Sequence, residues 1–226
     1  IYRHGDRSPT FSYPKSIADE FFWPNGFGQL TLRGQIQQIR LGQYFRERYS
    51  KLLNSTYVAS ELMGVSKCPY FFELVEEIRN TEQIQNISQD FRKFFDKLEM
   101  WTGSKINDLF DAWFIADIVL IEALYNKSSS WANTLVLSQL QQIADLSFYH
   151  LFNSFETSRI IAGPIIRDIM ENIRNIISNK SNRWKAKIYS GHDATIFAIL
   201  SYFQANYIHQ PPYSSTLFFD LYHIPG

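Results

Sequence analysis

Residues 1–9 read Ile1-Tyr2-Arg3-His4-Gly5-Asp6-Arg7-Ser8-Pro9. The apolar start is typical of the end of a β-strand, and the polar residues after it, with a Gly and a Pro among them, are typical of a loop. A second unit of this kind lies near the other end of the sequence. There, residues 184–189 alternate apolar and basic side chains, which predicts a strand, and a tight turn at 190–193 follows.

The sequence between and after these units has the apolar spacing of α-helices. One helix is predicted from about residue 31 to 52, with Thr31 as its N-cap, and further helical patterns fill residues 69–177. Residues 194–202 begin a mainly apolar helix, and residues 216–222 favour a further strand. Strand–loop–helix units at both ends, with helices between them, predict an α/β sheet decorated by a helical subdomain. In such a sheet, the loops after the carboxyl ends of the strands form the binding crevice.

The composition predicts a globular chain with a sizeable core. Hydrophobic residues make up 45% and charged residues 19% of the 226 residues. The 22 basic side chains balance 22 acidic ones, which argues against nucleic acid or an anionic membrane as the main partner. The apolar stretch at residues 194–208 is shorter than the roughly 20 residues that a membrane-spanning helix needs.

The side chains of the first loop suit a phosphate. Arg3 and Arg7 lie on either side of His4. Two guanidinium groups supply forked, permanently charged donors that match phosphate oxygens, and an imidazole between them could attack phosphorus as a nucleophile. The alternative is a solvated turn whose arginines pair with carboxylates such as Asp6.

The second loop supplies an acid. Asp193 could protonate the alkoxide that leaves phosphorus, because a carboxyl group beside a phosphate dianion can stay protonated in mildly acidic solution. His192 could donate a hydrogen bond to a phosphate oxygen. Alternatively, the Gly-His-Asp sequence simply begins a helix, whose positive end favours an acidic residue.

Other chemistries lack their motifs. The sequence has no Gly-x-x-x-x-Gly-Lys-Ser/Thr loop, no Gly-x-Ser-x-Gly elbow, no His-Glu-x-x-His and no paired Cys motif, so it predicts neither a metal site nor a cofactor. The single Cys68 cannot form an internal disulfide. Three Asn-x-Ser/Thr sequons, at Asn54, Asn86 and Asn126, would carry glycans only in a secretory compartment.

The two loops together resemble the paired signature of the histidine acid phosphatases, especially their animal prostatic and lysosomal members. The likeness extends to residues 23–31, 130–132 and 211–213. It implies one domain over residues 1–226 with a phosphoglycerate mutase-like histidine phosphatase fold, in which helices flank a central, mainly parallel sheet. Residues 1–66 and 180–226 would form this α/β core, and residues 67–179 would form the helical cap subdomain.

The resemblance also implies an activity. The family hydrolyses phosphomonoesters through a phosphohistidine intermediate and without a metal. By this likeness, His4 would be the phosphorylated nucleophile and Asp193 the proton donor, while phosphate would be bound by Arg3, Arg7 and His192. The substrate would be a small-molecule phosphomonoester or a phosphoprotein. The chain would be a secreted or lysosomal glycoprotein that could form a homodimer, although the sequence shows no signal-peptide pattern.

One part of the sequence departs from the family pattern. Between the first long helix and Cys68 the family has a longer region, with a further strand and a third phosphate-binding Arg, where this chain has only residues 57–63. The chain therefore resembles a shortened copy. A second hypothesis is a non-catalytic or nearly inactive paralogue or splice product that binds phosphorylated ligands. A third is a mutase-like phosphotransferase.

Overall fold

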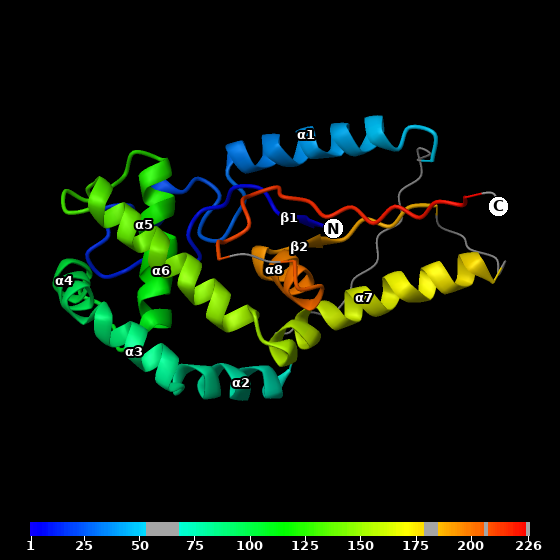
Figure 1. The fold of residues 1–226 in the computed structure, drawn as a ribbon. Coiled ribbons are helices and arrows are strands. Elements are labelled where there is room, and N and C mark those ends of the chain that lie inside the picture. Colours follow the sequence, from blue (N-terminus) through cyan, green and yellow to red (C-terminus); the bar gives the residue numbers. More distant parts are fainter. Residues whose placement is uncertain (53–67, 179–184, 206–207, 225–226) are drawn as a thin grey trace.

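The computed structural model describes residues 1–52, 68–178, 185–205 and 208–224 (Figure 1). Two short strands lie near the centre of the molecule, with α1 on one side and α7 and α8 on the other. The remaining labelled helices, α2 to α6, form a second group that contacts α7 and α8 (Figure 1). The helices are α1 Leu32–Arg48, α2 Pro69–Arg79, α3 Glu82–Asp90, α4 Arg92–Thr102, α5 Leu109–Leu124, α6 Thr134–Phe152, α7 Phe155–Ile177 and α8 Asp193–Tyr202; the strands are β1 Tyr2–Arg3 and β2 Ser190–Gly191.

The sheet is narrower than the sequence predicts. β1 and β2 pair in parallel, with Tyr2 opposite Ser190, and Tyr2 also forms an antiparallel bridge with Thr216. The backbone N–H and C=O groups of Ile1 both bond to Leu217. The structure is thus α/β, but its described residues do not form the central sheet that we expected.

The two strands predicted at 184–189 and 216–222 were wrong in their extent. Residues 185–189 and 217–222 have no strand assignment, and Trp184 lies outside the described residues. Strand propensity is local, whereas a strand forms only where a partner satisfies its backbone groups. Within the described part of the chain, β1 is the only strand paired with β2.

The helical predictions agree better with the structure. α2 to α7 all lie within the helical stretch predicted at residues 69–177, and α8 begins one residue before the predicted start. α1 begins after the predicted Thr31 N-cap but ends at Arg48, short of residue 52. Phe91 separates two of these helices, because it directly follows α3 and directly precedes α4.

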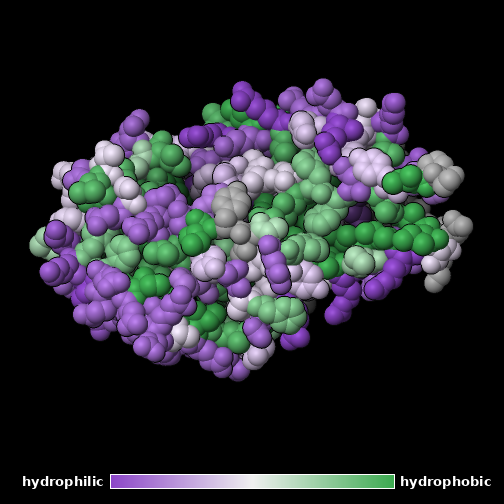
Figure 2. Space-filling model, viewed as in Figure 1, coloured by the Kyte–Doolittle hydropathy of each residue, from purple (hydrophilic) through white to green (hydrophobic). Residues whose placement is uncertain are grey.

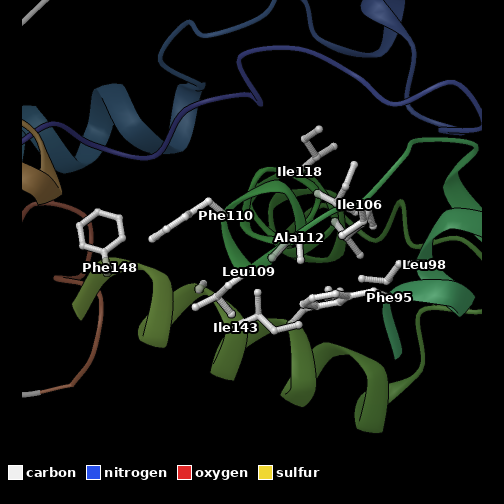
Figure 3. Close-up of a cluster of buried hydrophobic side chains, with 14 of the residues drawn as sticks. Phe95, Leu98, Ile106, Leu109, Phe110, Ala112, Ile118, Ile143 and Phe148 are labelled. Carbon is white, nitrogen blue, oxygen red and sulfur yellow. The ribbon is translucent and has the colours of Figure 1, made fainter. Parts of the chain in front are cut away.

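The main core lies in the helical group and extends to α8. Figure 3 shows Leu109 of α5 and Ile143 of α6 packed together with Phe95 of α4, and all three are fully buried. Phe197 of α8 joins this core through an edge contact with the Phe148 ring, whose centroid is 5.9 Å away. Burying such side chains contributes about 1.5–3 kcal/mol each. The core therefore fixes the position of the α8 N-terminus, where the second predicted loop lies.

Apolar side chains also lie on the surface. Figure 2 shows them on the right-hand side of this view, where residues 216–224 run between α1 and α7 in Figure 1. Phe219, Leu221 and Ile224 are among the exposed residues. Among the described residues, no helix combines the length and the apolar character needed to cross a bilayer.

Two glycines allow α1 to lie directly against the first loop. The Thr31 hydroxyl caps α1 by accepting a hydrogen bond from the Gly34 N–H at 3.1 Å. A Cβ atom added to Gly34 would overlap the Asp6 carbonyl, and one added to Gly5 would overlap the Gly34 carbonyl. Both overlaps are with backbone, so a side-chain rotation could not relieve them.

Replacing Gly34 with Ala should therefore destabilise the protein. We expect the free energy of unfolding, measured in urea, to fall by about 1–3 kcal/mol, the usual range for an overpacked site. Gly42→Ala on the same helix is the matched control, because a Cβ there meets nothing within 4 Å. That control should raise stability by up to about 1 kcal/mol through helix propensity. Equal effects of the two substitutions would contradict the close contact.

Candidate active site

The parallel pairing of β1 and β2 brings the two predicted loops to one edge of the sheet. His4 follows β1 and His192 follows β2, and their ring centroids lie 5.2 Å apart. The His4 N–H donates to the Gly191 carbonyl at 3.1 Å, which holds the two loops in register. All five side chains predicted for catalysis and phosphate binding come from these two loops.

The His4 ring has a defined tautomer. Its Nδ1 lies 2.7 Å from the Gly5 carbonyl oxygen, and because a carbonyl can only accept, Nδ1 carries the proton. Nε2 is then the nitrogen with a free electron pair. Burial lowers the pKa of the His4 imidazole below its ordinary value, and the Arg3 charge lowers it further, against the opposing effect of the Gly5 bond. These effects favour a neutral, nucleophilic ring.

The Arg3 guanidinium is buried and held on several sides. Its side chain donates to Oδ2 of Asp193 at 2.7 Å and to the Pro211 carbonyl, and it lies over the Tyr213 ring, 4.0 Å from the centroid. Arg3 Nε is buried and has no hydrogen-bond partner among the residues that the structure describes. Arg3 therefore has a fixed position and an unused donor.

Asp193 accepts hydrogen bonds on both oxygens. Besides Arg3, the Gln210 side chain donates to Oδ2 at 2.7 Å, and the Ala194 backbone N–H donates to Oδ1 at 2.8 Å. Gln210 is anchored in turn by its backbone N–H, which donates to Asp145 of α6 at 2.9 Å. His192 precedes α8 and has an exposed side chain.

Arg7 pairs with a carboxylate that the sequence did not single out. Its NH2 group lies 3.1 and 3.3 Å from the two oxygens of Asp117 on α5, and its NH1 group donates to the Ser8 carbonyl at 3.1 Å. Burial would lower the pKa of Arg7, but the nearby Asp117 carboxylate outweighs this and raises it.

Asp6 is not the partner of either arginine, although that was the alternative interpretation of the first loop. Its side chain is buried and accepts from the Thr31 hydroxyl at 2.6 Å and from the hydroxyl of Tyr125, the residue that follows α5. Asp6 therefore ties the loop to the start of α1 and to the end of α5.

The sequence analysis did not predict Asp117 or Gln210 as site residues. It included Tyr213 only within residues 211–213, as part of the likeness to the family. A charged residue within the mostly apolar pattern of residues 109–124 was the available signal for Asp117. Burial raises the pKa of Tyr213 to about 12, so its hydroxyl stays protonated.

Of the predicted sequons, Asn86 and Asn126 are exposed, whereas Asn54 lies outside the described residues.

Comparison with known proteins places these observations in a family. The model of the histidine phosphatase superfamily (branch 2) matches residues 1–66 and 70–224. Similar proteins include lysosomal acid phosphatase of Xenopus laevis, which is 29% identical over 98% of this chain and 65% of its own length. Prostatic acid phosphatase of Bos taurus is 28% identical over the whole chain and 73% of its own length. Lysosomal acid phosphatase of Homo sapiens is 28% identical over 98% of the chain and 66% of its own length.

This chain is shorter than its relatives within the matched region. It spans 65% of the length of the Xenopus laevis protein. That match runs over 279 positions whereas the chain has 226 residues, so at least 53 positions, the difference between the two, have no residue here.

Proposed function

The chain belongs to the histidine phosphatase superfamily, and from this premise we propose that it is an acid phosphatase that hydrolyses phosphomonoesters through a phosphohistidine at His4. The observation that carries the proposal is the His4 ring. Its Nδ1 is tied to the Gly5 carbonyl, so that Nε2 is free to attack, and it lies in the loop that also holds Arg3 and Arg7. The names of the relatives in the comparison support the same activity.

In the first step, His4 Nε2 attacks phosphorus and the bond from phosphorus to the ester oxygen breaks. Asp193 supplies the proton that the leaving oxygen takes up. Arg3, Arg7 and His192 donate to the other phosphate oxygens. Because Arg3 bonds Asp193 in this structure, the phosphate would take over the Arg3 donor and free the carboxyl group for proton transfer. In the second step, water attacks phosphorus, gives its proton to Asp193, and releases His4.

These roles predict an acidic pH optimum. Turnover needs His4 neutral, so it falls as the pH drops below the His4 pKa, which burial has lowered. Turnover also needs a proton that Asp193 can pass to the leaving oxygen, and acidic solution supplies it. The lowered His4 pKa extends the active range on the acidic side.

The missing internal positions should reduce the rate. The region between Asn54 and Cys68 is where the family resemblance implies a third phosphate-binding Arg, and residues 53–67 lie outside the described residues. Losing one electrostatic donor typically costs about a hundredfold to a thousandfold in rate. We expect that grafting the longer segment of a relative between these residues would raise kcat more than it lowers KM. A native chain as fast as its full-length relatives would contradict this deficit, with Arg33 or Lys67 as the substitute donor to test.

A second candidate function is phosphate binding with negligible turnover. It is favoured by the Arg3–Asp193 ion pair, which engages the carboxyl group that the reaction would need as its acid. The test is to measure two quantities on one preparation: the hydrolysis of an aryl phosphate from about pH 4 to about pH 7, where carboxyl and imidazole groups ordinarily titrate, and the binding of vanadate. Hydrolysis with an acidic optimum supports the phosphatase; tight vanadate binding without hydrolysis supports the binding protein.

We also propose the cellular setting by likeness to the relatives. A small-molecule phosphomonoester or a phosphoprotein would be the substrate, and the chain would be secreted or lysosomal. The exposed Asn86 and Asn126 would carry glycans there, and a homodimer is a further proposal. A mobility shift after glycosidase treatment of the secreted protein tests the glycan assignment.

A further inference from the structure

One face of α5 contacts the first loop (residues 3–9), which we call the catalytic loop, and the segment that follows it. Asp117 and Ile121 are four residues apart, so they lie on one face of α5, and Tyr125, four residues further on, directly follows the helix. Asp117 binds Arg7, and Tyr125 donates to Asp6. Ile121 is buried in a cluster with Ala18 and Trp23. The opposite side of α5 is fixed in the main core, so this face is a rigid support for the loop.

Asp117 holds Arg7 without using all of its donors. The carboxylate contacts NH2, and the Ser8 carbonyl contacts NH1. In the described part of the chain, the Nε–H and the second N–H of NH1 have no acceptor and remain for a ligand. Arg7 keeps about a fifth of its side chain exposed (18%), so the side chain can be reached from solution.

The helix itself gives no reason for a carboxylate at this position. α5 is mainly apolar, and within the described residues Asp117 forms its side-chain hydrogen bonds and its ion pair with Arg7. Asp117 lies near the middle of α5, away from the helix N-terminus that would favour a negative charge. We therefore infer that the Asp117 carboxylate is there to bind the Arg7 guanidinium.

We propose that Asp117 is a positioning residue that orients the Arg7 guanidinium for a phosphoryl group, so that the helical subdomain sets the phosphate affinity of the site. The inference rests on the proposed function, which makes phosphate the ligand. The ion pair with Asp117 restrains the long Arg7 side chain before phosphate binds. Without it, the side chain would lose its conformational freedom on binding, and this loss would weaken the affinity.

Removing Asp117 has two opposing effects on phosphate affinity. The guanidinium loses its orienting acceptor, which weakens binding, and the site loses a negative charge, which strengthens it. Two substitutions separate these effects. Asp117→Asn removes the charge but keeps an oxygen that accepts from Arg7, whereas Asp117→Ala removes both.

The experiment measures the dissociation constant of inorganic phosphate by calorimetry for both variants of the full chain. Positioning predicts that Asp117→Ala binds phosphate about 10-fold more weakly than Asp117→Asn, the usual effect of a hydrogen bond to a charged group. It also predicts that this difference disappears when Arg7 is replaced by Ala in both variants. Equal affinities of the two single variants, or a difference that persists without Arg7, would overturn the inference.

The matched control is Asp111→Ala. Asp111 lies on the same helix and also pairs with an arginine, its Oδ1 lying 3.2 Å from NH1 of Arg79, but it is outside the catalytic loop contacts. This control should leave phosphate affinity unchanged. Suppose that the variants show the predicted difference in phosphate affinity but the native chain hydrolyses no ester. That result would contradict the proposed reaction and leave the role of Asp117 standing. Equal affinities in a chain that does hydrolyse esters would contradict only the role of Asp117.

Discussion

Replacing His4 with Ala is expected to lower kcat for an aryl phosphate by at least about 10⁴-fold, because the reaction loses its nucleophile. The free energy of unfolding should change by less than about 1 kcal/mol, since His4 lies in a loop and outside the clusters of buried hydrophobic residues. Steady-state kinetics and urea unfolding of the same preparation measure the two quantities.

A second histidine provides the control for His4. His150 lies on α6, and burial lowers the pKa of its ring, as it does for His4, but it belongs to neither catalytic loop. His150→Ala should therefore keep the activity of the native chain. Phosphate should still bind to His4→Ala through the two arginines. A His4→Ala protein that is folded and retains more than about a tenth of the native rate would contradict the nucleophile assignment.

The second large effect is expected for Asp193→Asn, and it should depend on the leaving group. An alkoxide is a poor leaving group that needs a proton, so kcat for an alkyl phosphate should fall by about 10²–10⁴-fold. An aryl oxide leaves more readily, so the loss on an aryl phosphate should be clearly smaller. The ratio of the two losses, measured on one enzyme preparation, is the informative quantity.

Asp220→Asn is the matched control for this substitution. Asp220 pairs with Arg48 at 2.7 Å, the same distance as in the Arg3–Asp193 pair, but on the surface beside α1. Its replacement should affect both substrates equally and only slightly. Equal losses on alkyl and aryl phosphates in Asp193→Asn would exclude a role in protonating the leaving group.

The site residues of the two loops could be predicted from the sequence because, within each loop, they lie close together along the chain. Arg3 ends β1, His4 and Arg7 lie in the short loop that follows, and a parallel strand pair suffices to bring His192 and Asp193 to the same edge. Their roles as nucleophile, acid and phosphate donors stay predictions until the variants are measured. The partner that Asp193 has in this structure, the Arg3 side chain, could not be read from either loop alone.

Asp117 could not be predicted because its partner is remote in sequence. Arg7 and Asp117 are 110 residues apart, and helical periodicity shows which face a residue occupies but not what that face meets. The sheet shows the opposite failure. Ile188 and Phe219 have the propensity of strand residues, yet both are exposed and unassigned, because propensity does not provide a neighbouring strand.

The covalent intermediate is the most direct test of the central claim. The native chain is mixed briefly with a phosphomonoester labelled on phosphorus and quenched in alkali, where a phosphohistidine survives, and its peptides are analysed. The account predicts an acid-labile label on the peptide that contains His4, and no label in His4→Ala. A native chain that hydrolyses the ester but carries no label, or carries it on another residue, would contradict the mechanism.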